Sequence, residues 1–238
     1  MAFDLGEQAD IKKVPDRTGA GSYTWDSGIY DCVVDMAYLE ESKGGALGLH
    51  LTLVQNDRKL RESFYVTSGK SKGQKTYFMN QAGEKQYLPG FHQATNLCKT
   101  VLNQTLEEVA NSAEAKTISV YDPAKRTEVN VEKKHVLTSL IGNAAKVGVI
   151  KEIVNKRVRN AQGTYVDSNE KREQNQISTF FYPIDGRIVN EVETGIEDAL
   201  FIEQWKAENE GKTRDNFKEV EEVPEAAAPQ TNQGKLFS

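Results

Sequence analysis

Residues 47–54 read LGLHLTLV, and this stretch decides the fold class of the chain. Leucine occupies every second position up to Leu53, while Gly48, His50 and Thr52 fall between, so one face is apolar. Alternation with a period of two is typical of a β-strand that buries one face, whereas a helix needs apolar spacings of three and four. We therefore predict a strand here, with a core on its leucine face.

The flanking segments extend this strand into a meander. Residues 29–38 read as a strand of similar length, and the SKGG stretch at 42–45 predicts the turn between the two. After the second strand, residues 56–57 (ND) turn the chain into a third strand over 59–67. Three antiparallel strands joined by short turns are the result.

The remainder of the chain adds helices and further strands. We predict a helix over 91–111, a hairpin of 117–121 and 127–131, a long strand over 146–159, a polar loop to Asn175, a strand over 177–182, and a helix over 196–205 that stops before Gly211. This order predicts a mainly β protein: an OB-fold-like small barrel with added helices (α+β). A β-sandwich remains the alternative, and a doubly wound sheet is excluded because strands and helices do not alternate.

Charge divides the chain into a body and a tail. Residues 190–238 hold 5 basic and 12 acidic residues, so the 30 basic and 35 acidic residues of the whole chain leave 25 and 23 for residues 1–189. A basic body with an acidic end hints at nucleic-acid interaction. We expect an N-terminal arm over 1–26, one domain over 27–211 that ends in a helix, and a flexible acidic tail over 212–238.

Composition predicts a cytoplasmic protein without a membrane anchor. No apolar run approaches the roughly 18 residues of a membrane span, and the first residues have neither a basic n-region nor an apolar h-region. Cys32 and Cys98 are far apart and outside metal-ligand spacing, so neither a disulfide framework nor a zinc site is expected.

Basic and aromatic residues gather in the third strand and the loop after it. Residues 58–85 hold 7 basic and 2 acidic residues. Proteins that bind single-stranded nucleic acid combine cations for the phosphates with rings on which bases stack. The candidate residues are Arg58, Lys59, Arg61, Tyr65, Lys70, Lys72, Lys75 and Tyr77. The alternative is that Tyr65 packs against the body and the lysines form an ordinary solvated loop.

A second basic cluster surrounds the end of the long strand. Its members are Lys151, Lys156, Arg157, Arg159, Tyr165, Lys171 and Arg172. The position of this cluster in the loop that returns from the strand predicts that two loops flank one groove. Tyr165 then either stacks a base or covers the end of the barrel.

The chain resembles a known group of proteins in two regions. The segments 28–34 (GIYDCVV), 41–45 (ESKGG) and 49–53 (LHLTL), and the later stretch from 149–156 (VIKEIVNK) to 209–214 (NEGKTR), are similar to single-stranded DNA-binding proteins of tailed bacteriophages. This resemblance implies an OB-fold that binds single-stranded DNA without sequence preference in replication or recombination, an acidic tail and no catalytic centre. Tails of this class carry their acidic residues close to the terminus, whereas here the acidic residues up to Glu225 precede a neutral stretch.

The last residues of the tail suggest a partner. Residues 233–237 (QGKLF) resemble the Q-x-x-L-F peptide with which bacterial replication proteins bind the sliding clamp. Leu236 and Phe237 would fill an apolar pocket while the Gln233 amide hydrogen-bonds beside it, and few residues need ordering. A plain tail ending is the alternative, and a homo-oligomer is left open.

Enzymatic alternatives rest on weaker patterns. Asp122, Glu132 and Lys134 have the D…E-x-K arrangement of metal-dependent nucleases. Asp122 also begins a turn with Pro123, and Glu132 and Lys134 fit an ordinary charged strand end. We therefore expect no enzyme and no cofactor, and we keep the nuclease and a protein-interaction or virion-assembly module as alternatives.

Overall fold

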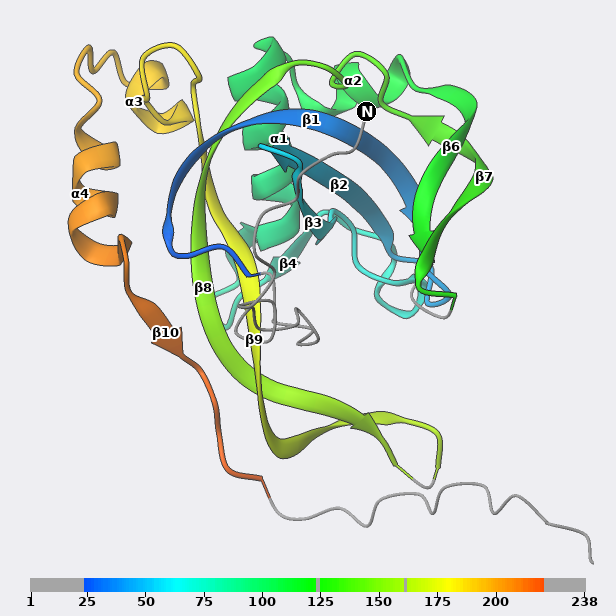
Figure 1. The fold of residues 1–238 in the computed structure, drawn as a ribbon. Helices are drawn as coiled ribbons and strands as arrows, with labels where there is room; N and C mark the ends of the chain where they lie inside the picture. Colours follow the sequence, from blue (N-terminus) through cyan, green and yellow to red (C-terminus); the bar gives the residue numbers. More distant parts are fainter. Residues whose placement is uncertain (1–23, 123–124, 161, 221–238) are drawn as a thin grey trace, which may run out of the picture.

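The computed structural model describes residues 24–122, 125–160 and 162–220, which form a mainly β fold with a few helices (Figure 1). The strands are β1 (Gly28–Glu41), β2 (Leu47–Gln55), β3 (Arg58–Tyr65), β4 (Tyr77–Met79), β5 (Lys85–Tyr87), β6 (Glu114–Asp122), β7 (Thr127–Val136), β8 (Ala144–Arg159), β9 (Tyr165–Phe181) and β10 (Thr213–Asp215). The helices are α1 (Pro89–Leu102), α2 (Leu106–Asn111), α3 (Val189–Glu193) and α4 (Leu200–Asn209), and Lys70–Lys72 form a 3₁₀ turn.

The predicted meander is confirmed in β1, β2 and β3. Leu49, Leu51 and Leu53 are buried on one face of β2, as their alternation predicts. Asn56 and Asp57 have left-handed backbone angles, φ 46° and 64°, which match the two-residue turns that join twisted antiparallel strands. The hairpin register places Gln55 opposite Arg58 and keeps the leucine face of β2 in register with Leu60 and Phe64 of β3.

The strand β1 links the meander to the rest of the main sheet. Its later part pairs with β2, its first residues pair antiparallel with β8, and Tyr38 and Leu39 pair with β7. A register shift between Val34 and Met36 bends β1, as bulges do. The β6–β7 hairpin therefore stands beside the meander, while β8 and β9 continue away from it (Figure 1).

The β8–β9 hairpin corrects the expected polar loop before Asn175. The structure has β9 as a strand from Tyr165 onwards, paired with β8 along most of its length. The far half of this hairpin extends beyond the body (Figure 1). Both of its faces meet solvent, so residues 165–175 lack the apolar alternation that would mark a strand.

The predicted helix over 91–111 is two helices. Asn103 takes a left-handed conformation (φ 55°) and ends α1, as such residues often do. Thr105 then caps α2 in a capping box with Glu108. The buried face of α1 includes Leu97 and Cys98, and α1 lies against β3 and β9, so it covers one side of the core.

The expected C-terminal helix begins later than predicted, at Leu200, and ends at Asn209, before Gly211 with its φ of 68°. Trp205 of α4 packs with Ile150 and Phe181 in a second, small cluster. Thr213–Asp215 then runs parallel to β8. Residues 212–220 thus belong to the described body, although the sequence places them in the tail.

The C-terminal segment stays on the hairpin beyond β10. Asn155 accepts a hydrogen bond from the Lys218 N–H (3.0 Å) and donates to its carbonyl (2.6 Å). Asn169 makes the same two contacts with Val220, both at 2.9 Å. Side-chain amides therefore continue the backbone pairing that β10 begins.

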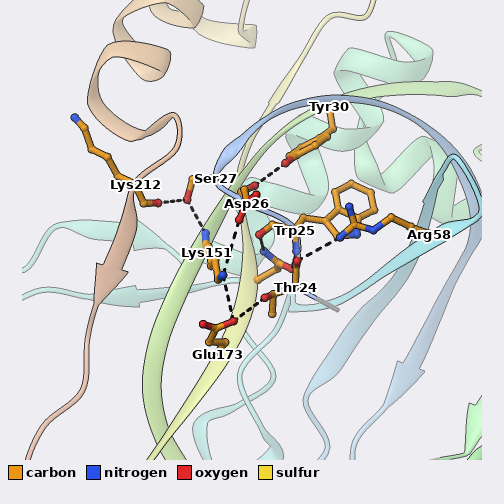
Figure 2. Close-up of polar contacts among 10 residues, drawn as sticks. Thr24, Trp25, Asp26, Ser27, Tyr30, Arg58, Lys151, Glu173 and Lys212 are labelled. Atoms are coloured by element: carbon orange, nitrogen blue, oxygen red, sulfur yellow. Dashed lines mark hydrogen bonds and ion pairs between the residues drawn. The ribbon is translucent and has the colours of Figure 1, made fainter. Parts of the chain in front are cut away.

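The N-terminal segment is anchored in a similar way (Figure 2). Asn175 accepts from the Trp25 N–H (2.7 Å) and donates to the Trp25 carbonyl (2.8 Å). Ser27 donates to the Lys212 carbonyl and accepts from the Lys151 N–H, so the segment joins β8 to the C-terminal strand. Residues 24–26 of the predicted arm are therefore part of the body, and residues 1–23 lie outside the described residues.

Neighbouring strands of the main sheet follow the order β3-β2-β1-β8-β9. At the two ends of this series β3 and β9 approach each other, but no ladder joins them in the described residues. The Glu62 carboxylate of β3 instead lies close enough to the Ile177 N–H of β9 for that group to lower its pKa. Within the described ranges, no helix is long and apolar enough to cross a membrane.

Candidate nucleic-acid interface

A groove of about 870 Å³ lies beside β3. We call it the β3–β4 groove. Parts of its lining come from residues 62–65 of β3, from residues 77–79 of β4, from the start of α1 and from Gln176–Ile177 of β9. The loop between β3 and β4 contributes residues 67–69, 71, 72 and 75. It thus occupies the place where β3 and β9 approach without pairing.

Two lysines of the groove have no ion-pair partner among the described residues. Lys72 and Lys75 both line it, whereas Lys59 and Lys70 nearby form ion pairs with carboxylates. The loop that carries them is held by the Lys70 N–H, which donates to the Gly44 carbonyl (2.9 Å), and by the Ser68 N–H, which donates to the Lys75 carbonyl (2.8 Å). The backbone that carries the two lysines is therefore held in place, and their ammonium groups are available to an anion.

Tyr65 supplies an exposed ring to the same groove. Its side chain is 53% exposed, and it lies over Gly48 of β2, where a Cβ would meet the ring at 3.5 Å. A Cβ at Gly90 would meet the Tyr65 carbonyl oxygen at 2.3 Å, so glycine is required for α1 to begin this close to β3. The ring is thus supported from behind and open to solvent in front.

Tyr77 of β4 lines the groove as well. Its ring has the Lys75 ammonium at 5.7 Å and the Lys85 ammonium at 4.2 Å from the centroid, distances at which cations and ring faces attract. The structure thus brings together Tyr65, Lys72, Lys75 and Tyr77 of the first predicted set. Lys70 lies outside the lining and forms an ion pair with Glu41 at 2.7 Å.

A smaller hollow of about 310 Å³ adjoins the groove on the outer face of β1, β2 and β3. Lys59 and Arg61 line it, but both are paired: Lys59 with Asp35 (3.1 Å) and Glu128 (3.2 Å), and Arg61 with Glu128 (3.2 Å). These contacts, first of all the hydrogen bond from Lys59, lower the pKa of the exposed Glu128 carboxyl. An anion that binds here has to compete with Glu128.

Three rings of this hollow were not predicted from the sequence. Tyr38 and His50 stack with centroids 4.9 Å apart and planes at 18°, and Tyr121 lies 5.1 Å from the Arg61 guanidinium. Ser63 hydrogen-bonds to His50 Nδ1 at 2.9 Å, and burial lowers the pKa of His50. Tyr38 and His50 share the outer face because β1 and β2 pair them in register, a register that a single strand does not reveal.

The groove and the hollow form one continuous surface. Glu62 and Ser63 line both of them, so β3 is the ridge between the two. Burial raises the pKa of Glu62, and hydrogen bonds from the N–H groups of Ser63 and Ile177 oppose that rise. A flexible chain can lie along this surface and pass Tyr65, Ser63 and Arg61 in order.

Arg58 and Lys151, two of the residues predicted to bind DNA, have partners within the protein (Figure 2). Arg58 donates to the Thr24 carbonyl (3.2 Å), and its guanidinium lies 5.3 Å from the Trp25 ring centroid. Lys151 lies 3.2 Å from the Glu173 carboxylate and 3.8 Å from that of Asp26. Both side chains hold the N-terminal segment against the body.

The second predicted cluster is on the β8–β9 hairpin, and none of its residues lines the groove. Its side chains make local contacts: Lys156 with Glu170, Arg157 with Asp167, Arg159 with the Gly163 carbonyl, Lys171 with Asp215 and the Phe217 ring, and Arg172 with Gln174. Tyr165 is 58% exposed near the hairpin end. The structure therefore does not bring this second cluster to the β3–β4 groove, because the far half of the hairpin extends away from the body (Figure 1).

The candidate nuclease residues are not brought together. Asp122 lies opposite Thr127 in the β6–β7 hairpin, whereas Glu132 lies opposite Thr117, five residues further along β6. Five strand residues span about 17 Å, too far for one metal ion, and Lys134 lies further still along β7. The described residues also contain no cluster of three or more His, Cys, Asp or Glu side chains that could hold a metal ion.

The predicted clamp-binding residues Gln233, Leu236 and Phe237 lie outside the described residues. Comparison of the chain with protein families, with curated proteins and with solved structures found no match.

Proposed function

We propose that this chain is a non-catalytic protein that binds single-stranded DNA without sequence preference through the β3–β4 groove and the adjoining face of β3. The observation that carries the proposal is that Lys72 and Lys75, which have no ion-pair partner among the described residues, line one groove with the exposed Tyr65 ring. Phosphates need such cations and unstacked bases need such rings, and neither requires a particular base.

We also infer that the fold is OB-like. The strand order β3-β2-β1-β8-β9 with α1 after the third strand agrees with a five-stranded, partly open Greek-key barrel. The gap between β3 and β9 is the open seam of that barrel, and the carboxylate of Glu62 bridges it. OB barrels bind oligonucleotides on their second and third strands, where Tyr65 and Arg61 stand.

From the resemblance to phage proteins we infer that this activity serves phage DNA replication or recombination in the bacterial cytoplasm, and that the acidic tail recruits partner proteins. The tail peptide is tested separately. A peptide of residues 224–238 should bind a bacterial sliding clamp, and the Leu236→Ala, Phe237→Ala version should not. Equal binding of the two peptides to the clamp would remove this part of the proposal and leave DNA binding untouched.

The first experiment measures the anisotropy of end-labelled oligo(dT) with and without Mg²⁺, followed by a gel of the recovered oligonucleotide. A label on the DNA is needed because Trp25 and Trp205 are only 1% and 4% exposed and neither lines the groove. Binding with intact DNA supports the proposal. Shortened DNA in Mg²⁺ supports the nuclease, and no binding at all supports a protein-interaction module.

Two exposed tyrosines make a matched pair of variants. Tyr65→Ala should weaken oligo(dT) binding by about 5- to 150-fold, since a base stacked on a ring contributes about 1–3 kcal/mol. Tyr165→Ala removes an equally exposed ring from the hairpin and should change affinity less than about 2-fold. The reverse result would move the interface from the groove to the hairpin.

A further inference from the structure

The β4–β5 ribbon is separate from the main sheet. β4 and β5 pair only with each other in the described part of the chain, and their exposed side chains include Phe78 and Met79. Residues 77–79 nevertheless line the β3–β4 groove, which Tyr65 lines as well. The ribbon therefore presents apolar side chains to a groove and buries none of them in the core.

Internal contacts make the ribbon a stiff unit. At its tip, Asn80 Oδ1 accepts hydrogen bonds from the N–H groups of Ala82 and Glu84, both at 2.9 Å. Along its length, the Lys85 ammonium lies 4.2 Å and 4.7 Å from the ring centroids of Tyr77 and Tyr87. These contacts hold the two strands together and do not involve the main sheet.

The base of the ribbon is narrow. The Leu88 N–H donates to the Thr76 carbonyl at 2.9 Å, and Tyr87 stacks on Phe91 of α1 with centroids 5.3 Å apart. Immediately before the ribbon, Gly73 and Gln74 have positive φ angles of 79° and 51°. The contacts described here thus join the ribbon to the body at its base, and its strands pair with no strand of the main sheet in the described residues.

We propose that the β4–β5 ribbon is a flap that closes over nucleobases, so that Phe78 and Met79 cover the bases which Tyr65 stacks. This inference rests on the proposed function, and it adds residues outside the predicted set. A flat apolar base fits between an aromatic ring and a pliable methionine side chain. Lys72 and Lys75 line the same groove and bind the phosphates that accompany the bases.

Charge favours DNA over a peptide as the occupant. Residues 65–93 carry four basic side chains, Lys70, Lys72, Lys75 and Lys85, and one acidic side chain, Glu84. The charged residues that line the groove itself are Lys72, Lys75 and Glu62, so two ammonium groups against one carboxylate, together with the apolar walls, complement a polyanion that carries apolar faces. A strand of DNA supplies both phosphates for the lysines and apolar base faces for the apolar side chains of the groove.

The test uses the full chain and two oligonucleotides of equal length, oligo(dT) and an abasic strand with the same number of phosphates. The Phe78→Ala, Met79→Ala variant should weaken oligo(dT) binding about 10-fold and abasic binding less than about 2-fold. The control is Ile184→Ala, which removes an exposed apolar side chain outside the groove and should change neither. Hydrogen exchange of residues 77–87 should also slow when oligo(dT) binds.

The possible results distinguish a failure of the flap inference from a failure of the proposed function. If wild type binds oligo(dT) and the double variant binds it equally well, or loses affinity equally for both strands, the flap does not contact bases and this inference is overturned. If wild type binds neither strand, the proposed function itself fails. Since Phe78 and Met79 are exposed, unfolding of the variant is not expected, and an unchanged melting curve verifies this.

Discussion

Removal of residues 213–238 should destabilise the body, whereas removal of residues 221–238 should not. The difference comes from the contacts of the C-terminal segment with the hairpin, above all those of Glu152 of β8, which is buried and has its carboxylate 3.3 Å from Arg214 and 3.2 Å from Asn216. The longer deletion takes away both partners and, among the described residues, leaves Gln174 at 3.5 Å as the remaining hydrogen-bond partner of this carboxylate. The shorter deletion starts after Val220 and keeps every contact described for this segment.

The size of the effect follows from the buried charge. Breaking a fully buried ion pair costs about 3–5 kcal/mol. Because the Arg214 side chain is 47% exposed, we expect about 2–3 kcal/mol for the longer deletion. In a domain of this size that corresponds to a melting temperature lower by roughly 4–12 °C, while the shorter deletion should stay within about 0.5 kcal/mol of wild type.

Urea denaturation of the two truncated proteins measures the difference. Glu152→Gln in the longer deletion is the informative control, because it removes the charge and keeps the shape of the side chain. It should recover part of the lost free energy of unfolding. Equal unfolding midpoints for the two deletions would show that the C-terminal strand does not stabilise β8, and the reasoning about Glu152 would be refuted.

Two further substitutions test the core and the seam. Gly148→Ala places a Cβ 2.9 Å from Trp205 and 3.0 Å from Thr179, so it should reduce the free energy of unfolding by about 1–3 kcal/mol, measured against Gly44→Ala, whose Cβ meets nothing closer than 4.0 Å. Equal effects of the two glycine substitutions would contradict this packing. Burial raises the pKa of the Glu62 carboxyl in the folded protein. Its charge therefore lowers the free energy of unfolding at pH values above that raised pKa, and has no such effect at pH values below the pKa of the unfolded chain. Glu62→Gln should therefore be more stable than wild type at pH 7 and equal to it near pH 3 in thermal melts, and a variant less stable at pH 7 would contradict the sign.

Local patterns predicted much of this fold. The alternation in residues 47–54 and the turn residues after it predicted the meander correctly, because one face of β2 meets the core and the other does not. The same rule fails for residues 165–175, which pair with β8 outside the core and carry polar side chains on both faces. It also misses Thr213–Asp215, a strand too short to show any period.

The residue types of the candidate site could be predicted from the sequence, but which individual residues belong to the site could not. Tyr65, Lys72 and Lys75 were identified from composition, and the structure places them in one groove. Arg58 and Lys151 have the same residue types, but their partners lie far away in sequence. Pairing between strands decides which cations remain available, and a single sequence does not reveal that pairing.

The most direct test of DNA binding in the β3–β4 groove is the salt dependence of oligo(dT) affinity in wild type and in Lys72→Gln, Lys75→Gln. Each lost phosphate contact reduces the slope of log K against log salt by about 0.7 for a single strand. We expect a slope shallower by about 1.4, with no change in Lys116→Gln, Lys206→Gln, whose lysines lie on β6 and α4 outside the groove. Equal slopes for wild type and the groove variant, at measurable affinity, would contradict the account.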